Sequence, residues 1–361
     1  MTLSSGIVSP ESTNARGHER NPEAPVEHAA EPLLPMPFPL EARTLTGKRV
    51  CVVIPAYNEE AVLPRTHAAL ADVLNRSGVS WSIVFINDGS RDRSAGVLEA
   101  LHRSDPHVGY ILLSRNFGHQ AALTAGLDHA DGDVIVTMDA DLQHPPEMIP
   151  RLLAAWAEGY DVVHTRKLTT EGLSRWRDVL TRVAYRLISR ISEVEIIPHA
   201  SDYRVLDAEA LDAVRRLPEH ARLYRGLTPW VGFRQCVVPY VAAPRAAGTS
   251  QYGLKQLVSL FARAFFDFSR LPLHLGLWLG AGALALSVLY LLFILAWLLL
   301  GESTPPGWAS SISVTLLLSS VSLVFSGIIG VYVARIYDEV RARPSYVMSR
   351  FRPPEPDSTG E

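Results

Sequence analysis

The sequence contains little cysteine and lacks several motifs that would assign a function directly. Only Cys51 and Cys236 occur among the 361 residues, and both lie in strand-like apolar stretches, which favours buried thiols in a reducing compartment over a disulfide or a metal pair. No Gly-x-Gly-x-x-Gly turn and no Walker lysine motif is present, which counts against dinucleotide binding and ATP-loop chemistry. The formal net charge is only −3, so charge gives no reason to expect a nucleic-acid partner.

The first 46 residues lack any sustained hydrophobic period. They are rich in Pro, Glu, Ala and Ser, a composition that buries too little apolar surface to offset the entropy lost on ordering. No basic start precedes an apolar core, so the segment does not resemble a secretory signal. We expect residues 1–46 to form a disordered N-terminal tail.

The sequence after the tail alternates between strand and helix patterns. Apolar runs that predict strands lie at 49–54, 82–86, 108–113, directly before Asp139, and at 160–164. Helical patterns follow the first three runs, at 62–74, 95–101 and 120–129. Continuous apolar runs are typical of strands that are buried on both faces of a parallel sheet, and the alternation indicates βαβ units. The sequence therefore predicts an α/β fold with a doubly wound, mostly parallel sheet over residues 47–253.

Polar residues follow these apolar runs directly. Asp139 and Asp141 come after the fourth run, and Gln143 adds an amide oxygen. Mg²⁺ prefers one or two carboxylates together with water and substrate phosphate oxygens, and ligands of open α/β sheets bind at the carboxyl ends of the strands. Two acidic residues in a turn are also commonly just solvated, so this motif needs support from the rest of the chain.

Two earlier strands carry side chains suited to a nucleotide at the same edge of the sheet. Tyr57 and Glu59 follow the first run and Asp88 follows the second. An aromatic ring can stack on a base, and carboxylates can accept hydrogen bonds from base N–H groups or ribose hydroxyls. Since the glycine-rich phosphate loops are missing, the sequence favours a nucleotide whose diphosphate is held by a metal ion instead.

Four segments, taken in order, resemble the family 2 glycosyltransferases of the GT-A fold. They are Val53-Ile-Pro-Ala-Tyr-Asn-Glu-Glu60, Asn87-Asp-Gly-Ser90, Arg115-Asn-Phe-Gly118 and Met138-Asp-Ala-Asp-Leu-Gln-His-Pro-Pro-Glu147. The chain is most similar to the polyprenyl-phosphate branch, the dolichol-phosphate mannose synthase and GtrB-like enzymes, from about Lys48 to Arg343. The resemblance implies that the donor nucleotide contacts Pro55, Tyr57, Glu59, Asp88, Asp139 and Ala140. It also implies that Mg²⁺ or Mn²⁺ is held by Asp139, Asp141 and Gln143, the first two being catalytic.

Residues 174–196 combine an apolar helical stripe with arginines, as in a basic amphipathic helix at a membrane surface. An ordinary surface helix with a solvated basic face is the alternative. In the family that the chain resembles, basic residues here approach the lipid phosphate. Our candidates for binding the acceptor phosphate are Arg166, Arg182, Arg186, Arg204 and Arg245. Of these, Arg166 is also assigned a catalytic role. Arg204 and Arg225 could equally form structural ion pairs. Gln251 stands where relatives usually carry a lysine, and we expect Arg245 to supply the missing positive charge.

The C-terminal third of the chain is apolar enough to enter a membrane. A juxtamembrane amphipathic helix is expected at 254–272, followed by spans at 273–300 and 311–335, each long enough for a hydrocarbon core of about 30 Å. The loop between the spans contains Glu302 but no Lys or Arg, whereas Arg335, Arg341 and Arg343 follow the second span. The positive-inside rule then places the catalytic domain and both termini, including a tail at 336–361, in the cytoplasm. The sequence thus predicts a multi-pass protein of the cell (inner or plasma) membrane. A buried helical hairpin of a soluble protein is the alternative to two membrane spans. Within the first predicted span, Gly276, Gly280 and Gly282 would allow close helix packing and so support a homo-oligomer.

These features predict a membrane-bound, inverting glycosyltransferase. It would move one sugar from a UDP- or GDP-linked donor to an undecaprenyl- or dolichyl-type polyprenyl monophosphate on the cytoplasmic leaflet. A phosphomonoester has a second pKa of about 6, so this acceptor is already an anionic nucleophile and needs no general base. One alternative is a processive polysaccharide synthase, although the Gln-x-x-Arg-Trp motif is missing. The other is a non-catalytic scaffold that binds a nucleotide-sugar.

Overall fold

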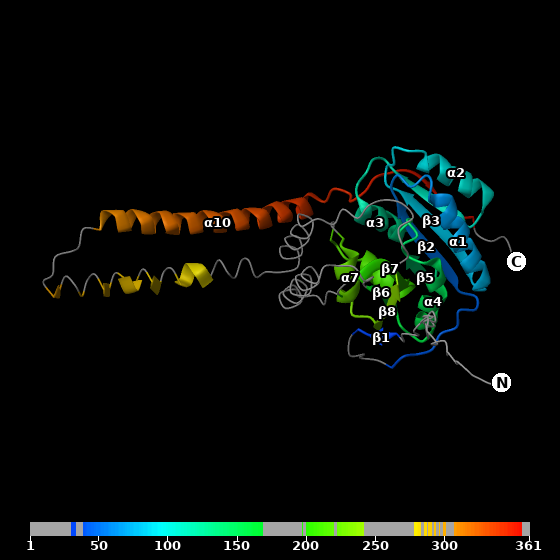
Figure 1. Cartoon of the computed structure of the whole chain (residues 1–361), viewed down its shortest axis with the longest axis horizontal. Coiled ribbons are helices and arrows are strands. Elements are labelled where there is room, and N and C mark those ends of the chain that lie inside the picture. The colour runs from blue at the N-terminus through cyan, green and yellow to red at the C-terminus, as the bar shows by residue number, and fades with distance from the viewer. Residues whose placement is uncertain are drawn as a thin grey trace, which may run out of the picture.

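The structure, a computed structural model, describes residues 30–33, 39–168, 197, 200–219, 222–241, parts of 278–300, and 307–355. Figure 1 shows an α/β domain from which one long helix, α10 (Trp308–Arg341), extends outward. The predicted α/β fold class is confirmed.

One nine-stranded sheet runs through the described part of the domain, in the order β1-β8-β6-β7-β5-β2-β3-β4-β9. The strands are β1 (Glu31–Pro32), β2 (Arg49–Ala56), β3 (Ser80–Asn87), β4 (Val108–Leu113), β5 (Val134–Thr137), β6 (Val162–Leu168), β7 (Ala200–Asp207), β8 (Gln235–Val241) and β9 (Met348–Arg352). The strands predicted from apolar runs correspond to β2, β3, β4, β5 and β6.

The sheet is mixed, which corrects the prediction of a mostly parallel sheet. Strands β5, β2, β3 and β4 are parallel neighbours, as are β6 and β8. Strand β7, however, runs antiparallel between β5 and β6, and β1 and β9 pair antiparallel at the two edges. Because β7 is reversed, it begins at the edge where β5 and β6 end, and this brings the first residues of β7 close to Asp139.

Helices cover both faces of the sheet. They are α1 (Leu63–Arg76), α2 (Ser94–Ser104), α3 (His119–His129), α4 (Ile149–Ala157), α6 (Ala208–Arg215) and α7 (Tyr224–Trp230). Side chains of α1, α2 and α4 share one core with Val50, Val52 and Ile54 of β2, whereas α3 and α6 share the second core with Cys51 and Val53. Successive strand residues point to opposite faces, so the continuous apolar run of β2 follows from its burial on both sides. Cys51 and Cys236 are both buried and free, as predicted.

Part of the expected N-terminal tail packs against the domain. Strand β1 pairs with β8, and Arg43 forms ion pairs with Asp161 and Asp207. The Arg43 guanidinium also lies over the Trp156 ring, 5.2 Å from its centroid. The structure therefore differs from the sequence expectation at residues 39–46, because charge pairing and cation–π contact hold a segment that has few apolar side chains of its own.

The C-terminal part combines an apolar helix with a strand. Among the described residues, one helical stretch, Leu318–Arg341, is long and apolar enough to cross a membrane, and none of its most apolar window is buried. It overlaps the second predicted span. The first predicted span is described only in part, and the interface segments at 174–196 and 254–272 lie outside the described residues. Beyond α10 the expected tail instead supplies β9, which pairs with β4.

Candidate active site

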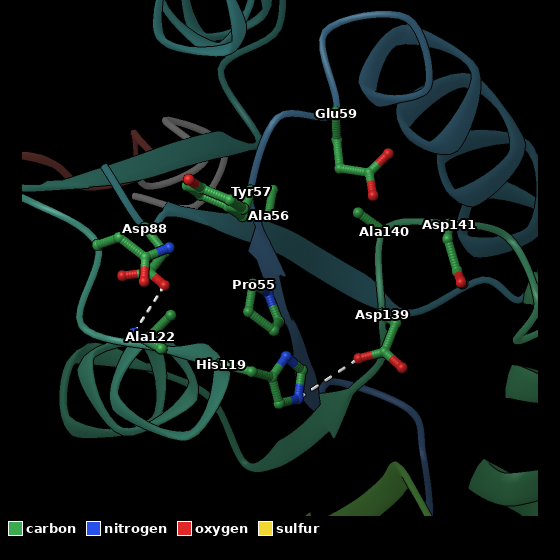
Figure 2. A pocket seen from close by; sticks show the side chains of 12 residues that line it. Pro55, Ala56, Tyr57, Glu59, Asp88, His119, Ala122, Asp139, Ala140 and Asp141 are labelled. Carbon is green, nitrogen blue, oxygen red and sulfur yellow. Dashed lines mark hydrogen bonds and ion pairs between the residues drawn. The ribbon is translucent and has the colours of Figure 1, made fainter. Parts of the chain in front are cut away.

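A cleft of about 290 Å³ opens at the carboxyl edge of the parallel strands. Its lining comes from the ends of β2, β3 and β5 and from the start of α3: Pro55, Ala56, Tyr57, Glu59, Asp88, Asn116, Gly118, His119, Ala122, Asp139, Ala140 and Asp141. In Figure 2 the acidic groups of Glu59, Asp139 and Asp141 lie on one side, and Tyr57 and Asp88 lie on the other. The structure thus brings together all six residues predicted to contact the donor nucleotide, together with Asp141.

The acidic side of the cleft brings three carboxylates together, those of Glu59, Asp139 and Asp141. Oδ1 of Asp139 is buried and has no hydrogen-bond partner. The pKa of Glu59 is raised by its partial burial and by the charges of Asp141, Asp92 and Asp139. Carboxylates that lie this close together favour a bound cation.

The opposite side of the cleft is organised by Asp88. Its Oδ1 accepts a hydrogen bond from Phe117 N at 2.7 Å and its Oδ2 accepts one from Gly118 N at 2.9 Å. Gly89 next to it has φ +63°, and a Cβ there would lie 2.3 Å from the carbonyl carbon of Arg115. The Asn87–Ser90 turn therefore needs glycine, and Asp88 serves first to hold the loop that leads into α3.

His144 was not singled out from the sequence, although it lies in the same motif as Asp139. It is buried, and its Nδ1 accepts a hydrogen bond from the Asp139 backbone N–H at 3.0 Å. The ring proton must then be on Nε2, which lies 2.6 Å from Ser201 Oγ. Burial lowers the pKa of His144, so the 3.7 Å approach of Nδ1 to the Asp139 carboxylate is not an ion pair. The neutral ring fixes the Asp139 backbone to β7.

His119 was also missed, and it links the cleft to a buried charge cluster. Its Nε2 lies 3.6 Å from Asp139 Oδ1 and 3.5 Å from Asp202 Oδ2. Burial opposes protonation of His119, but the hydrogen bond to Asp202 and the charges of Asp139 and Asp202 raise its pKa overall. Asp202 also pairs with Arg204 and Arg225, at 2.9 and 2.8 Å.

Comparison with known proteins identifies the chain. Residues 51–215 match the model of Glycosyl transferase family 2. An uncharacterized glycosyltransferase of Bacillus subtilis, YkcC, is 39% identical over 83% of this chain and 93% of its own length. The chain belongs to glycosyl transferase family 2. A bactoprenol glucosyl transferase derived from prophage SfII of Shigella flexneri is 33% identical to this glycosyltransferase over 84% of the chain and 98% of its own length. A glucosyl-3-phosphoglycerate synthase structure from Mycobacterium tuberculosis covers 61% of the chain and 78% of its own, with 18% identity and a TM-score of 0.42.

The residues of the glycosyltransferase cleft fit a divalent ion that the substrate helps to hold. No group of three His, Cys, Asp or Glu side chains within the described ranges could hold a metal by itself. Asp139 offers an unpartnered oxygen, and Asp141 lines the same cleft. One or two carboxylates, completed by water and substrate phosphate, match the preference of Mg²⁺.

Gln143 takes a different place from the one predicted. It does not line the cleft, and its Nε2 donates to Asp141 Oδ2 at 2.8 Å while its backbone N–H donates to Asp141 Oδ1 at 3.1 Å. In this arrangement Gln143 orients Asp141, and its predicted role as a ligand has no support from the geometry.

Two of the predicted acceptor arginines lie elsewhere in the glycosyltransferase. The side chain of Arg204 is 1% exposed and donates to Asp202, to Thr228 Oγ1 and to the carbonyls of Ser201 and Tyr224. It cannot reach an acceptor, so its role is structural. Arg166 pairs with Glu31 of β1 at 3.0 Å and does not line the cleft. Arg182, Arg186 and Arg245 lie outside the described residues.

Proposed function

We propose that this glycosyltransferase moves one sugar from a UDP- or GDP-linked donor to a polyprenyl monophosphate at the cytoplasmic face of a membrane. The observation that carries the proposal is the 33% identity to a bactoprenol glucosyl transferase over 98% of that protein. An apolar helix whose most hydrophobic window is wholly unburied supports a substrate that resides in the membrane.

The donor would lie in the cleft with its diphosphate toward the acidic side. Asp139 and Asp141 would hold a divalent ion, Mg²⁺ or Mn²⁺, which when bound neutralises charge on the departing nucleoside diphosphate. Asp88 keeps the loop before α3 in place, and Tyr57, 41% exposed at the rim, offers a ring for base stacking. His144 and Gln143 keep the two aspartates oriented.

The acceptor would attack the anomeric carbon directly, with inversion of configuration. A phosphomonoester with a second pKa of about 6 is largely a dianion at neutral pH, so no side chain has to remove a proton from it. The new bond joins a phosphate oxygen to the anomeric carbon, and the bond from that carbon to the donor diphosphate breaks. Arg182, Arg186 and Arg245 remain our candidates for holding the acceptor phosphate through forked hydrogen bonds.

The proposal is tested by incubating membranes that contain the full chain with labelled UDP- and GDP-sugars, Mg²⁺ or Mn²⁺, and polyprenyl phosphate. We expect a lipid product that carries a single sugar. A longer glycan on the lipid would favour the processive synthase, and the absence of lipid product with every donor would contradict the proposal.

Replacing Asp141 with Asn tests the ion site in the same assay. Loss of one carboxylate from the acidic side should reduce turnover at least about 100-fold, the scale on which transition-state charge stabilisation acts. Asp131→Asn is the matched control, because its side chain is 79% exposed and pairs with Arg49 at the surface, where such pairs contribute little. Equal turnover in the two variants would remove the ion from the proposal.

A further inference from the structure

The segment that follows α10, residues 343–355, runs back along the edge of the domain, and Figure 1 shows it in red. Val347 O accepts a hydrogen bond from Ser114 N at 2.9 Å, β9 pairs with β4, and Glu355 N donates to Pro106 O at 2.9 Å. We call this segment the C-terminal strap. Because it is bonded to the domain along its length, the chain between α10 and the cleft has a fixed path.

Tyr346 connects the C-terminal strap to the last turn of α3. Its hydroxyl donates to Asp128 Oδ2 at 3.1 Å, and its ring lies edge-on to the ring of His129, with 6.3 Å between the centroids. Burial and the charge of Asp128 raise the pKa of Tyr346, so the hydroxyl keeps the proton that it donates. Arg222 Nη1 donates to the other carboxylate oxygen, Asp128 Oδ1, at 2.9 Å. The end of α3 is therefore held from two sides.

The side of α3 that packs on the sheet carries mostly small side chains. Its buried residues are Ala122, Leu123, Thr124, Ala125, Gly126 and Leu127. Four of these six are threonine or smaller, and a Cβ on Gly126 would lie 2.4 Å from Val53 Cγ1, so the helix lies very close to β2. Small side chains form shallow ridges that interlock little with their neighbours. The position of α3 along its axis therefore depends on the contacts at its two ends.

The first end of α3 forms part of the cleft. Gly118, His119 and Ala122 line it, and Asp88 Oδ2 accepts a hydrogen bond from Gly118 N at 2.9 Å. The other end, 11 residues along the helix, is the one that the C-terminal strap holds. Packed helices move as stiff elements, by small sliding shifts. The contact at the end of α3 therefore bears on the wall of the cleft at its start.

We propose that Tyr346 is a positioning residue for the donor, because through Asp128 it holds α3 where Gly118 and His119 form the wall of the cleft. The inference rests on the part of the proposed function that places the donor nucleotide in this cleft, and it needs no lipid acceptor. The chain segment attached to α10 thereby sets the shape of the donor site. Because coupling between two sites is reciprocal, a nucleotide bound in the cleft must in turn stabilise the C-terminal strap.

The test compares full-length, detergent-solubilised Tyr346→Phe with the wild type by calorimetric titration with UDP and with GDP, in the presence of Mg²⁺. We expect the variant to bind the preferred nucleotide at least about threefold more weakly, since it loses a hydrogen bond to a charged group that holds α3. The KM for the matching nucleotide-sugar should rise by a similar factor, and the KM for undecaprenyl phosphate should stay within about twofold. Unchanged nucleotide affinity and KM values would overturn the inference.

Tyr160→Phe is the matched control. It also removes one tyrosine hydroxyl, but Tyr160 follows α4 and belongs to the core on the opposite face of the sheet from α3. It should leave the nucleotide affinity unchanged.

Asp128→Ala removes the acceptor of the hydrogen bond whose donor is Tyr346. The double variant, Asp128→Ala with Tyr346→Phe, should therefore bind the nucleotide no more weakly than Asp128→Ala alone. Additive losses would mean that Tyr346 acts through another contact, and they would overturn the role of Asp128. If Asp128→Ala does not fold, Tyr346→Phe and hydrogen exchange decide the inference.

Hydrogen exchange separates positioning from stability alone. Nucleotide and Mg²⁺ should slow the exchange of the backbone amides of residues 343–355 at least about threefold in the wild type, and this slowing should be lost in Tyr346→Phe. Residues 70–76 are the internal control, because the end of α1 lies at the opposite edge of the sheet, just before β3 begins, and their exchange should not change. A lower Tm of Tyr346→Phe with no effect of the nucleotide on the strap would make Tyr346 purely structural and would overturn the inference.

Failure of this inference can be separated from failure of the proposed function. If the wild type bound neither UDP nor GDP, the donor site itself would be wrong and the role of the strap would fall with it. If the wild type bound a nucleotide that Tyr346→Phe bound equally well, only the inference would fail. If the wild type bound a nucleotide but glycosylated no lipid, the acceptor would be wrong, and nucleotide affinity and hydrogen exchange would still decide the inference.

Discussion

The Asp139 backbone is held by a neutral imidazole whose two nitrogens have separate tasks. Nδ1 of His144 accepts from Asp139 N–H and Nε2 donates to Ser201 Oγ, while the ring stacks on Tyr203 at 5.0 Å between centroids. Leu142, between the aspartates and this ring, has φ +57°, an uncommon backbone conformation for a leucine. Hydrogen bonds and ring stacking therefore hold the turn that carries Asp139 and Asp141 in a backbone conformation that Leu142 by itself does not favour.

Replacing His144 with Ala should reduce activity as well as stability, because His144 holds the turn that carries Asp139. The change leaves the Asp139 N–H and Ser201 Oγ without these partners, at a cost of about 1–3 kcal/mol, and releases the turn. We expect kcat to fall at least about tenfold, with a lowered Tm, measured by sugar transfer and by thermal melting of the detergent-solubilised protein.

His102→Ala is the control for this change. His102 is partly buried and its Nδ1 lies 2.6 Å from the carbonyl of Val108, away from the residues that line the cleft. It should lower Tm without a comparable effect on kcat. An equal loss of kcat in both variants would mean that His144 matters only for stability.

Sequence reasoning identified the cleft residues but not the burial of the arginines. Tyr57, Glu59 and Asp139 were predictable because they follow apolar runs whose parallel pairing brings their ends together. Arg204 was misassigned because its burial depends on Tyr224 and on other residues of α7 distant in sequence. No periodicity within a single segment reveals such a contact, so the short Ser-Asp-Tyr-Arg run gave no means of choosing between a structural ion pair and a phosphate site.

At the scale of elements, β9 fastens the end of α10 to the edge of the sheet. It pairs with β4, and Val347 O accepts a hydrogen bond from Ser114 N at 2.9 Å, just before the loop that Asp88 holds. Phe351 packs against the core that contains α3. The segment after the apolar helix thereby supports the strand that leads into the cleft.

Phe351→Ala should destabilise the domain by about 2–3 kcal/mol, somewhat below the 3–5 kcal/mol typical of fully buried phenylalanine, because Phe351 is only partly buried. Met348→Ala, in the same strand but 37% exposed, is the control and should cost well under half as much. Chemical denaturation in detergent measures both. Similar values for the two variants would show that β9 contributes through its backbone alone.

The elements that were predictable are those defined by their own sequence. Strands β2 to β6 are apolar runs and needed no knowledge of their neighbours. Strands β7 and β9 are not continuous apolar runs, because both contain charged residues. Their sequences are Ala-Ser-Asp-Tyr-Arg-Val-Leu-Asp and Met-Ser-Arg-Phe-Arg. They become strands because β5 and β4 present unpaired edges to them, and that information is not local.

At the scale of the whole molecule, α10 is an apolar arm attached to a domain with its own two cores. Figure 1 shows the arm leaving the domain, and the exposed side chains along it include Leu323, Ile329 and Val333. Large apolar side chains in such a row indicate a surface that is covered in the native environment. The apolar composition of this helix was predictable from sequence, whereas its continuation to Arg341 and into β9 was not, because residues 336–361 were expected to form a tail.

A lysine in the middle of this arm should weaken its insertion in a membrane, and the same lysine at its end should not. Ile329, near the centre of Leu318–Arg341, is 54% exposed, and Val340, beside Arg341, is 77% exposed. A charge at the centre of a span costs about 2.5–3.5 kcal/mol, whereas lysine near the end can extend to the interface. Ile329→Lys should therefore lower the fraction of full-length protein that resists alkaline extraction from membranes, while Val340→Lys leaves it unchanged. Because neither side chain belongs to the two cores, Tm of the α/β domain should stay the same in both. Equal extraction of the two variants would mean that α10 lies against protein or at the membrane surface instead of within the bilayer.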